Sequence, residues 1–312
     1  MKTEVVFFGT HNFAAKILQG LIDSPDFNVG LVITQPDQPV GRKKEWQACP
    51  VKILAEKNNL KIKQPVSLKD FDNDLSSFVV AVVAQYGKII PAKLLTMPKK
   101  GMVNVHASLL PKYRGASPIQ TAILNGDILT GISLIKMDET MDTGPILTKK
   151  EIPINPNETY PELEAKLADL ATPLLLQSLP LYLSGKLQLQ AQDNRDATYT
   201  KILKREDGQI NFKQKAEQIY NQWRAFFPWP GIFWETKLNS QSFKIKLLKI
   251  QLTDLSMEQP AGSLIALSKN RLGVVGGDKK ILEILELQAE NKNPMTALEF
   301  INGFKVNQIK DI

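Results

Sequence analysis

The sequence predicts an α/β domain with an open, mostly parallel sheet, followed by a small antiparallel β-barrel. Short apolar runs alternate with segments of helical spacing in the first half of the chain, as in sheets whose parallel strands are joined by helices. A polar stretch with few long apolar residues then precedes several short strand-like runs separated by turn residues. We therefore expect a Rossmann-like catalytic domain over residues 1–187, a linker over 188–206 and an OB-like domain over 207–312.

The chain opens with a strand, a turn and a helix. Residues 4–10 form an almost continuous apolar run, and residues 12–22 carry helical spacing. The turn lacks the second and third glycines of a dinucleotide-binding loop. His11 in this turn is interpreted as a polar residue at the helix start, with a ligand role as the alternative. Further strands are expected at residues 29–34, 78–85, up to His106, 131–137 and at the edge over 146–154, and helices at 50–58, 117–126 and 158–183, the last broken at Pro173 and Pro180.

A long loop follows the second strand and reads Gln35-Pro-Asp-Gln-Pro-Val-Gly-Arg-Lys-Lys-Glu-Trp. Its cations Arg42, Lys43 and Lys44 can grip phosphate, and Trp46 can stack on a base. A solvated charged loop with Trp46 packed into the core is the alternative, and the loop alone does not decide between them. The net charge of +7 allows a polyanionic partner without demanding one, because the basic residues are spread over both halves.

The second domain is expected to begin with a helix over residues 213–226. Short strands should follow at 232–238, 243–252, 262–267, 273–275 and 281–287, with a final helix at 296–304. Four aromatic residues beside prolines are expected in the core, namely Trp223, Trp229, Phe233 and Trp234. Lys244 and Lys246 share one face of a strand, which favours a solvated face over an RNA site.

Cysteine usage and hydropathy bear on the compartment. The single cysteine, Cys49, cannot form an internal disulfide, so the chain does not imply an oxidising environment. The apolar run near the N-terminus is too short for a signal peptide, and no later run has the length needed to span a membrane. We expect a cytoplasmic protein.

Asn104 and His106 end an apolar run and lie two residues apart, so on a strand both side chains leave the same face. Pro111 breaks the chain after them, which places the pair at the carboxyl end of a strand, where open α/β sheets bind ligands. An amide can donate to an oxygen that gains negative charge, and an imidazole can move a proton near neutral pH. Together they could serve acyl transfer, whereas a strand-end histidine capped by its neighbours is the alternative.

A carboxylate near the imidazole would fix its tautomer. Asp142, in a turn-rich acidic loop, is the expected partner of His106, with Asp138 and Glu139 as competitors. We expect this loop, the loop after Tyr86 and the loop after His106 to converge on the carboxyl edge of one parallel sheet. Such chemistry needs neither a nucleophilic Ser or Cys nor a metal.

Two segments resemble the folate-dependent formyltransferases: Asn104-Val-His-Ala-Ser-Leu-Leu-Pro-Lys-Tyr-Arg-Gly-Ala-Ser-Pro-Ile-Gln and Met137-Asp-Glu-Thr-Met-Asp-Thr-Gly-Pro. The Gly9-Thr-x-x-Phe-Ala opening, the basic loop and Arg224-Ala-Phe-Phe-Pro-Trp-Pro extend the similarity nearly from end to end. The basic loop and the second domain point to the branch of this family that acts on a charged tRNA.

The resemblance implies that Asn104, His106 and Asp142 carry catalysis, with 10-formyltetrahydrofolate as the formyl donor. It places the donor against Tyr86, Gly87, Ile89, Ile90, Ser108, Leu109, Leu110, Pro111 and Asp138. It implies methionyl-initiator tRNA as the acceptor, held by Arg42, Lys43 and Lys44 and by the second domain, and it implies no metal. We expect a monomer. The alternatives are a formyltransferase for an amino sugar or for glycinamide ribonucleotide, and a nucleotide- or RNA-binding module with a dead site.

Overall fold

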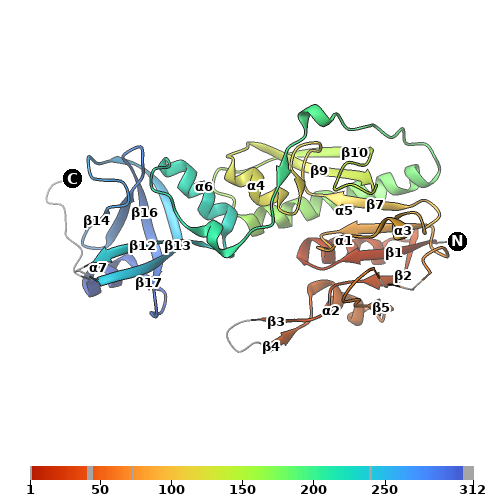
Figure 1. Ribbon diagram of the computed structural model, residues 1–312, viewed down its shortest axis with the longest axis horizontal. Helices are drawn as coiled ribbons and strands as arrows, with labels where there is room; N and C mark the ends of the chain where they lie inside the picture. Colours follow the sequence, from red (N-terminus) through yellow and green to blue (C-terminus); the bar gives the residue numbers. More distant parts are fainter. Residues whose placement is uncertain (1, 41–44, 70, 72–73, 239–240, 305–312) are drawn as a thin grey trace. The chain divides into compact units, whose positions relative to one another are not determined.

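The computed structural model describes residues 2–40, 45–69, 71, 74–238 and 241–304 (Figure 1). By internal contacts the chain forms two compact units. The first runs to Pro118 and adds Leu129–Pro153 and Glu162–Lys201; the second comprises Ile119–Ile128, Ile154–Pro161 and the chain from Ile202. The domain bounds derived from the sequence stay a prediction.

A seven-stranded sheet forms the centre of the first unit, counted over the described residues. Its order is β10-β9-β7-β6-β1-β2-β5. Strands β5, β2, β1, β6 and β7 are parallel, β9 is antiparallel to β7, and β10 is antiparallel to β9, which confirms the mostly parallel sheet. The bounds are β1 Thr3–Gly9, β2 Phe27–Ile33, β5 Ile62–Lys63, β6 Val80–Ala84, β7 Met102–His106, β9 Leu129–Lys136 and β10 Ile146–Pro153.

Successive side chains of a strand point to opposite faces of the sheet, and both faces of this sheet are covered. On one face Val6 and Phe8 join a core that includes Leu75, Leu94 and Met102. On the other face helix α1 packs against β1, β2 and β6. The helices of this unit are α1 Asn12–Asp23, which begins after His11 as expected, α2 Pro50–Lys57, α3 Ala92–Leu95 and α5 Tyr160–Leu183, whereas α4 Pro118–Leu124 belongs mostly to the second unit.

Helix α5 corrects one prediction, because it runs without a break through Pro173 and Pro180. Each proline removes one backbone donor, but the helix buries apolar side chains on both sides of the prolines, including Leu167, Leu175 and Leu179. Burial of that face offsets the missing hydrogen bonds.

Two small pairings were not expected from the sequence. Strands β3 Gln38–Val40 and β4 Glu45–Gln47 form an antiparallel hairpin at the base of the basic loop, and β8 Arg114–Gly115 pairs in parallel with β11 Tyr199–Thr200. Trp46 is 74% exposed, so the alternative that packed it into the core is wrong. Arg42, Lys43 and Lys44 lie outside the described residues.

The second unit contains an antiparallel sheet in the order β12-β13-β16-β15-β14, with β17 paired to β16. Strand β13 is longer than expected, and the arrangement is consistent with an OB-like domain. Two short 3₁₀ helices, Asn194–Asp196 and Arg205–Gly208, lie between α5 and α6 along the chain. The bounds are α6 Ala216–Phe226, β12 Ile232–Leu238, β13 Gln241–Ser256, β14 Leu264–Ser268, β15 Arg271–Val275, β16 Lys280–Ala289, β17 Met295–Thr296 and α7 Ala297–Phe304.

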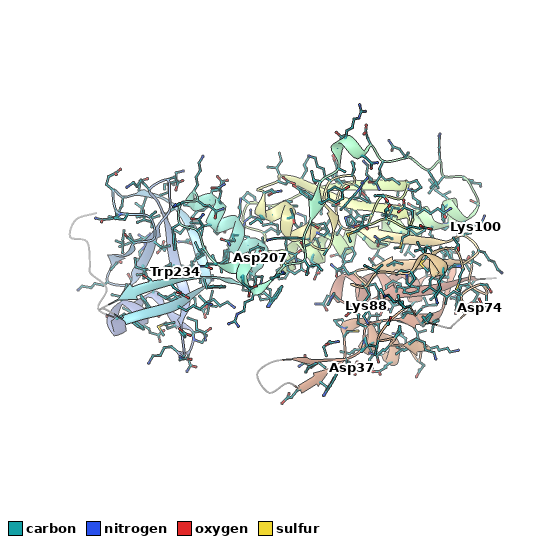
Figure 2. The ribbon with its side chains drawn as sticks, in the orientation of Figure 1. Asp37, Asp74, Lys88, Lys100, Asp207 and Trp234 are labelled. Atoms are coloured by element: carbon teal, nitrogen blue, oxygen red, sulfur yellow. The ribbon has the colours of Figure 1, made fainter. Side chains whose placement is uncertain are left out.

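The aromatic residues of this unit divide between core and surface. Trp223 and Trp234 are buried (Trp234 is labelled in Figure 2), and Phe233 is partly buried under the ammonium of Lys244, 3.7 Å from the ring centre. Trp229 is 57% exposed, so its expected burial is wrong. Its flanking prolines place it in a turn outside the sheet, where no sheet face covers the indole. None of the described helices is long and apolar enough to cross a bilayer.

Candidate active site

The three residues expected to act together meet in the first unit. Asn104 and His106 lie on β7, and both reach the carboxylate of Asp142, as their two-residue spacing predicts. The Asn104 amide nitrogen donates to Asp142 Oδ1 at 3.2 Å, and His106 Nδ1 lies 3.7 Å from Asp142 Oδ2. The side chains of His106 and Asp142 are only 6% and 13% exposed, so the cluster is shielded from bulk water.

Asp142 reaches this position by a route that differs from the prediction. Its loop was expected to leave the carboxyl edge of a parallel sheet, but β9 is antiparallel to β7 and pairs Lys136 with Val103. The loop therefore starts at the level of the amino end of β7 and turns back before β10. Asp142 sits at φ 55°, a left-handed conformation that a non-glycine residue adopts at a cost.

Backbone groups fix the carboxylate and the imidazole. The Gly115 N–H donates to Asp142 Oδ2 at 2.8 Å, and His106 Nε2 lies 3.0 Å from the carbonyl oxygen of Tyr113. A carbonyl can only accept, so this contact is a hydrogen bond when Nε2 carries the proton; we assign that tautomer from geometry. Nδ1 is then the basic nitrogen. A proton that arrives there creates an imidazolium between a carbonyl and a carboxylate, both of which stabilise its charge.

Asp138, which competes with Asp142 as the expected partner of His106, makes its hydrogen bonds elsewhere. Asp138 accepts hydrogen bonds from Thr143 Oγ1 at 2.7 Å and from the backbone and hydroxyl of Thr140, within its own loop. Glu139 is exposed. Geometry therefore favours Asp142 as the partner of His106, and Asp138 shapes the turn that leads to it.

The loop after β6 presents backbone and apolar side chains. Tyr86 turns its ring into the core, edge-on to Phe8, and its carbonyl accepts from Thr10 Oγ1 and Gln35 Nε2. The Tyr86 hydroxyl finds no partner among the described residues, and burial raises its pKa to about 12, so it stays protonated at neutral pH. In contrast Ile89 is 85% exposed.

The rest of this loop is held from outside it. Lys88 Nζ donates to the carbonyls of Pro65 and Val66 (Lys88 is labelled in Figure 2). Gly87 has φ +77°, where an added Cβ would meet Gln35 Nε2. Ile90 is 8% exposed and belongs to the core, whereas the neighbouring apolar side chain, Ile89, faces solvent.

The turn after β7 is also fixed by polar contacts. Ser133 Oγ donates to the Ser108 carbonyl and accepts from the Leu110 N–H, and Lys149 Nζ donates to the Leu110 carbonyl. Ser108 and Leu110 are completely buried, so their side chains shape the turn. Leu109 and Pro111 are partly exposed.

The base of the basic loop is anchored by an ion pair. Lys52 Nζ lies 2.7 Å from Asp37 Oδ2, and Gln64 donates to Asp37 and to the Gln35 carbonyl (Asp37 is labelled in Figure 2). The hydrogen bond from Lys52, with help from Gln64, lowers the pKa of the Asp37 carboxyl. The loop thus leaves a fixed platform, whose residue Gln35 also contacts the loop that follows β6.

Sequence reasoning missed the groups that hold the three side chains. Tyr113 and Gly115 act through their backbone, and Gln192 contacts the Asp142 loop from a stretch that reads as a polar linker. Tyr113 and Gly115 both lie inside the motif that begins at Asn104, but the motif does not show that their backbone groups contact His106 and Asp142. Among the described residues no three His, Cys, Asp or Glu side chains are grouped as metal ligands would be.

The arrangement combines three functions of acyl transfer in one place. An amide with two N–H donors uses one toward Asp142, and the second can bind an oxygen that becomes negative. The imidazole is oriented by the Tyr113 carbonyl and offers Nδ1 as a basic nitrogen, and the Asp142 carboxylate can stabilise the imidazolium that forms.

Comparison with known proteins shows which families the two parts of the chain match. Residues 1–179 match the model of the family described as formyl transferase, and residues 202–305 match that of the formyl transferase C-terminal domain. A methionyl-tRNA formyltransferase of Caldicellulosiruptor saccharolyticus is 41% identical over 98% of this chain and 98% of its own length. One of Thermodesulfovibrio yellowstonii is 40% identical over 100% and 99%.

Solved structures share the fold at lower identity. A sugar 3N-formyl transferase in the presence of dTDP and 5-N-formyl-THF has a TM-score of 0.66 at 20% identity and covers 94% of this chain and 100% of its own. An N-formyltransferase of Helicobacter canadensis in complex with folinic acid and dTDP-3-aminofucose has a TM-score of 0.67 at 21% identity, covering 91% and 99%.

Proposed function

Because the chain belongs to the formyl transferase family, we propose that it transfers a formyl group from 10-formyltetrahydrofolate to the α-amino group of methionyl-initiator tRNA. The products are N-formylmethionyl-tRNA, used in translation initiation, and tetrahydrofolate. The observation that carries this function is the identity of about 40%, over nearly the whole of both chains, to relatives named methionyl-tRNA formyltransferase.

The proposed chemistry assigns one step to each of three side chains. The amine nitrogen attacks the formyl carbon, and the formyl oxygen gains negative charge, which the Asn104 amide stabilises by on the order of 3 to 4 kcal/mol. His106 takes the proton lost by the amine and returns it to the donor nitrogen as the carbon–nitrogen bond breaks, worth roughly 10² to 10⁴ in rate. Asp142 stabilises the intermediate imidazolium.

The donor is proposed to lie against the loops after β6 and β7 and the loop before β10. Exposed Ile89 and Met141 offer apolar surface for a flat ring, and carbonyl and N–H groups of the same loops offer polar contacts. Tyr86, Gly87, Ile90, Ser108, Leu109, Leu110, Pro111 and Asp138 are proposed to contribute backbone contacts or to shape these loops. The group is a co-substrate that enters and leaves, so partial exposure of the loops suits it.

The acceptor is proposed to be held through its phosphates by Arg42, Lys43 and Lys44, with the second domain as a further contact. The anchored base of this loop supports the proposal, since a loop that grips RNA needs a fixed origin. We further propose a cytoplasmic monomer, with a catalytic domain over 1–187, a linker over 188–206 and a tRNA-binding domain over 207–312.

A direct assay tests the function. The protein is incubated with 10-formyltetrahydrofolate and radiolabelled methionyl-tRNA, or with an amino sugar nucleotide or glycinamide ribonucleotide in parallel. We expect formylation of the tRNA alone, with His106→Ala and Asn104→Ala each lowering kcat by orders of magnitude while circular dichroism stays native. Transfer to a sugar amine instead would assign the rival substrate, and failure on every amine would refute the proposed activity.

A further inference from the structure

Arg114, a fully buried cation, follows the turn that holds His106, and its side-chain hydrogen bonds go to residues other than the proposed catalytic ones. Arg114 is only 1% exposed and is the largest completely buried side chain of the described residues. A buried guanidinium is costly unless its N–H groups find acceptors. Its side-chain hydrogen bonds go to neutral oxygens: Gln192 Oε1 at 3.1 and 2.8 Å, Asn194 Oδ1 at 2.9 Å and the Tyr199 hydroxyl at 3.4 Å.

Gln192 connects Arg114 to the Asp142 loop by hydrogen bonds. While its Oε1 accepts from Arg114, its Nε2 donates to the carbonyl oxygens of Asp142 and of Gly144, both at 2.8 Å. Both ends of one amide are thus used. Acceptance from a cation polarises the amide and strengthens its donation, so the chain from Arg114 to Asp142 is stronger than separate neutral bonds.

The backbone that Gln192 contacts, at Asp142, is strained and depends on its surroundings. Asp142 holds a left-handed conformation at φ 55°, which persists only where the surroundings enforce it. Its carboxylate must meet Asn104, His106 and Gly115 at once. A turn of the Asp142 backbone would break these contacts together.

We infer that Gln192, held by Arg114, is a positioning residue that fixes the Asp142 carboxylate against His106 and Asn104 for formyl transfer. This inference rests on the proposed function and adds to it a residue from the segment between the two family matches. Gln192 touches neither substrate nor reacting atoms in this assignment; it acts through Asp142.

The two ends of the amide can be tested separately. Gln192→Glu keeps an oxygen for Arg114 but replaces the N–H donor with a second oxygen that faces two carbonyls. Asn194→Ala is the matched control, since it removes another Arg114 acceptor and leaves the Asp142 loop untouched. We expect kcat to fall roughly 10- to 100-fold in Gln192→Glu, with KM for donor and acceptor within about twofold. In Asn194→Ala kcat should stay within about twofold of wild type.

A double-mutant cycle separates positioning from general stability. If Gln192 acts through Asp142, then Gln192→Glu added to Asp142→Asn should lower the residual kcat by less than about twofold. A purely structural residue would lower activity by the same factor in both backgrounds. Folding is followed by circular dichroism and Tm, and Gln192→Met, which lacks both hydrogen-bonding atoms, carries the same comparison if the Glu variant does not fold.

The outcomes are distinct. Wild-type protein without formyl transfer would refute the proposed function itself. If the wild type is active, three results would overturn the positioning role alone. These are an unchanged kcat in Gln192→Glu, the same fall in kcat on adding Gln192→Glu to wild type and to Asp142→Asn, and a fall in kcat in Asn194→Ala equal to that in Gln192→Glu.

Discussion

Replacing Gly115 by alanine should damage both the stability and the turnover of the protein. Gly115 has φ +117°, and an added Cβ would lie 2.7 Å from the Thr200 carbonyl oxygen and 2.9 Å from Thr200 Oγ1. The strain of a non-glycine residue there costs about 1–3 kcal/mol. Relief by a backbone shift would weaken the N–H bond to Asp142 Oδ2, a charge-assisted bond worth about 1.5–3 kcal/mol.

Together these effects predict a loss of roughly 3–5 kcal/mol, and at about 2–4 °C per kcal/mol the Tm should fall by about 6–20 °C. Because Asp142 loses a fixed donor, kcat should fall at least about tenfold in the formylation assay.

Gly185→Ala is the control. Gly185 also has a positive φ, +73°, but no heavy atom lies within 4 Å of an added Cβ. It carries the backbone strain alone, so we expect a Tm loss of a few degrees, roughly 1 kcal/mol, and unchanged kcat. Equal losses of Tm and kcat in the two variants would refute the reasoning, because the Thr200 contact and the Asp142 bond would then have no effect.

Three further predictions concern other parts of the chain. Arg42→Ala should raise KM for charged tRNA and leave KM for the donor unchanged, with a smaller effect at high salt, and steady-state kinetics at two ionic strengths measure this. The hydrogen bond from Arg271 holds the pKa of the Glu283 carboxyl in the folded protein below its usual value. The ion pair therefore stabilises the fold fully at pH values above the usual carboxyl pKa, and this stabilisation is lost as the pH falls through the lower pKa of the folded state. The Tm difference between wild type and Glu283→Gln should therefore be largest near pH 7 and vanish in strong acid; a constant difference would contradict it. Trp234→Ala should cost about 3–5 kcal/mol in urea unfolding and Trp229→Ala less than about 1 kcal/mol, and similar losses would place both indoles in one environment.

Local patterns carried a large part of the structure. The apolar runs that predicted β1, β2, β6 and β9 are strands with nearly the expected bounds. Two-residue spacing predicted that Asn104 and His106 share a face, because side-chain direction in a strand has a period of two. The expected burial of Trp229 failed, since proline density marks a turn as readily as a core.

Position along the chain predicted the wrong origin for the Asp142 loop. An apolar run shows that a strand forms but carries no sign of its direction in the sheet, and β9 turned out antiparallel. Asp142 still reaches His106, because the loop is long enough to return before β10 pairs with β9.

By itself the sequence determined which elements form, which polar residues share a strand face and which family the motifs resemble, because each of these depends on neighbours along the chain. Only the tertiary structure decided what holds the carboxylate and the imidazole. The Gly115 N–H donates to the Asp142 carboxylate, the Tyr113 carbonyl accepts from His106, and Gln192, held by buried Arg114, donates to the backbone of the Asp142 loop. Hydrogen bonds from backbone groups and between residues far apart in the chain leave no local pattern, since their geometry exists only once the strands have packed.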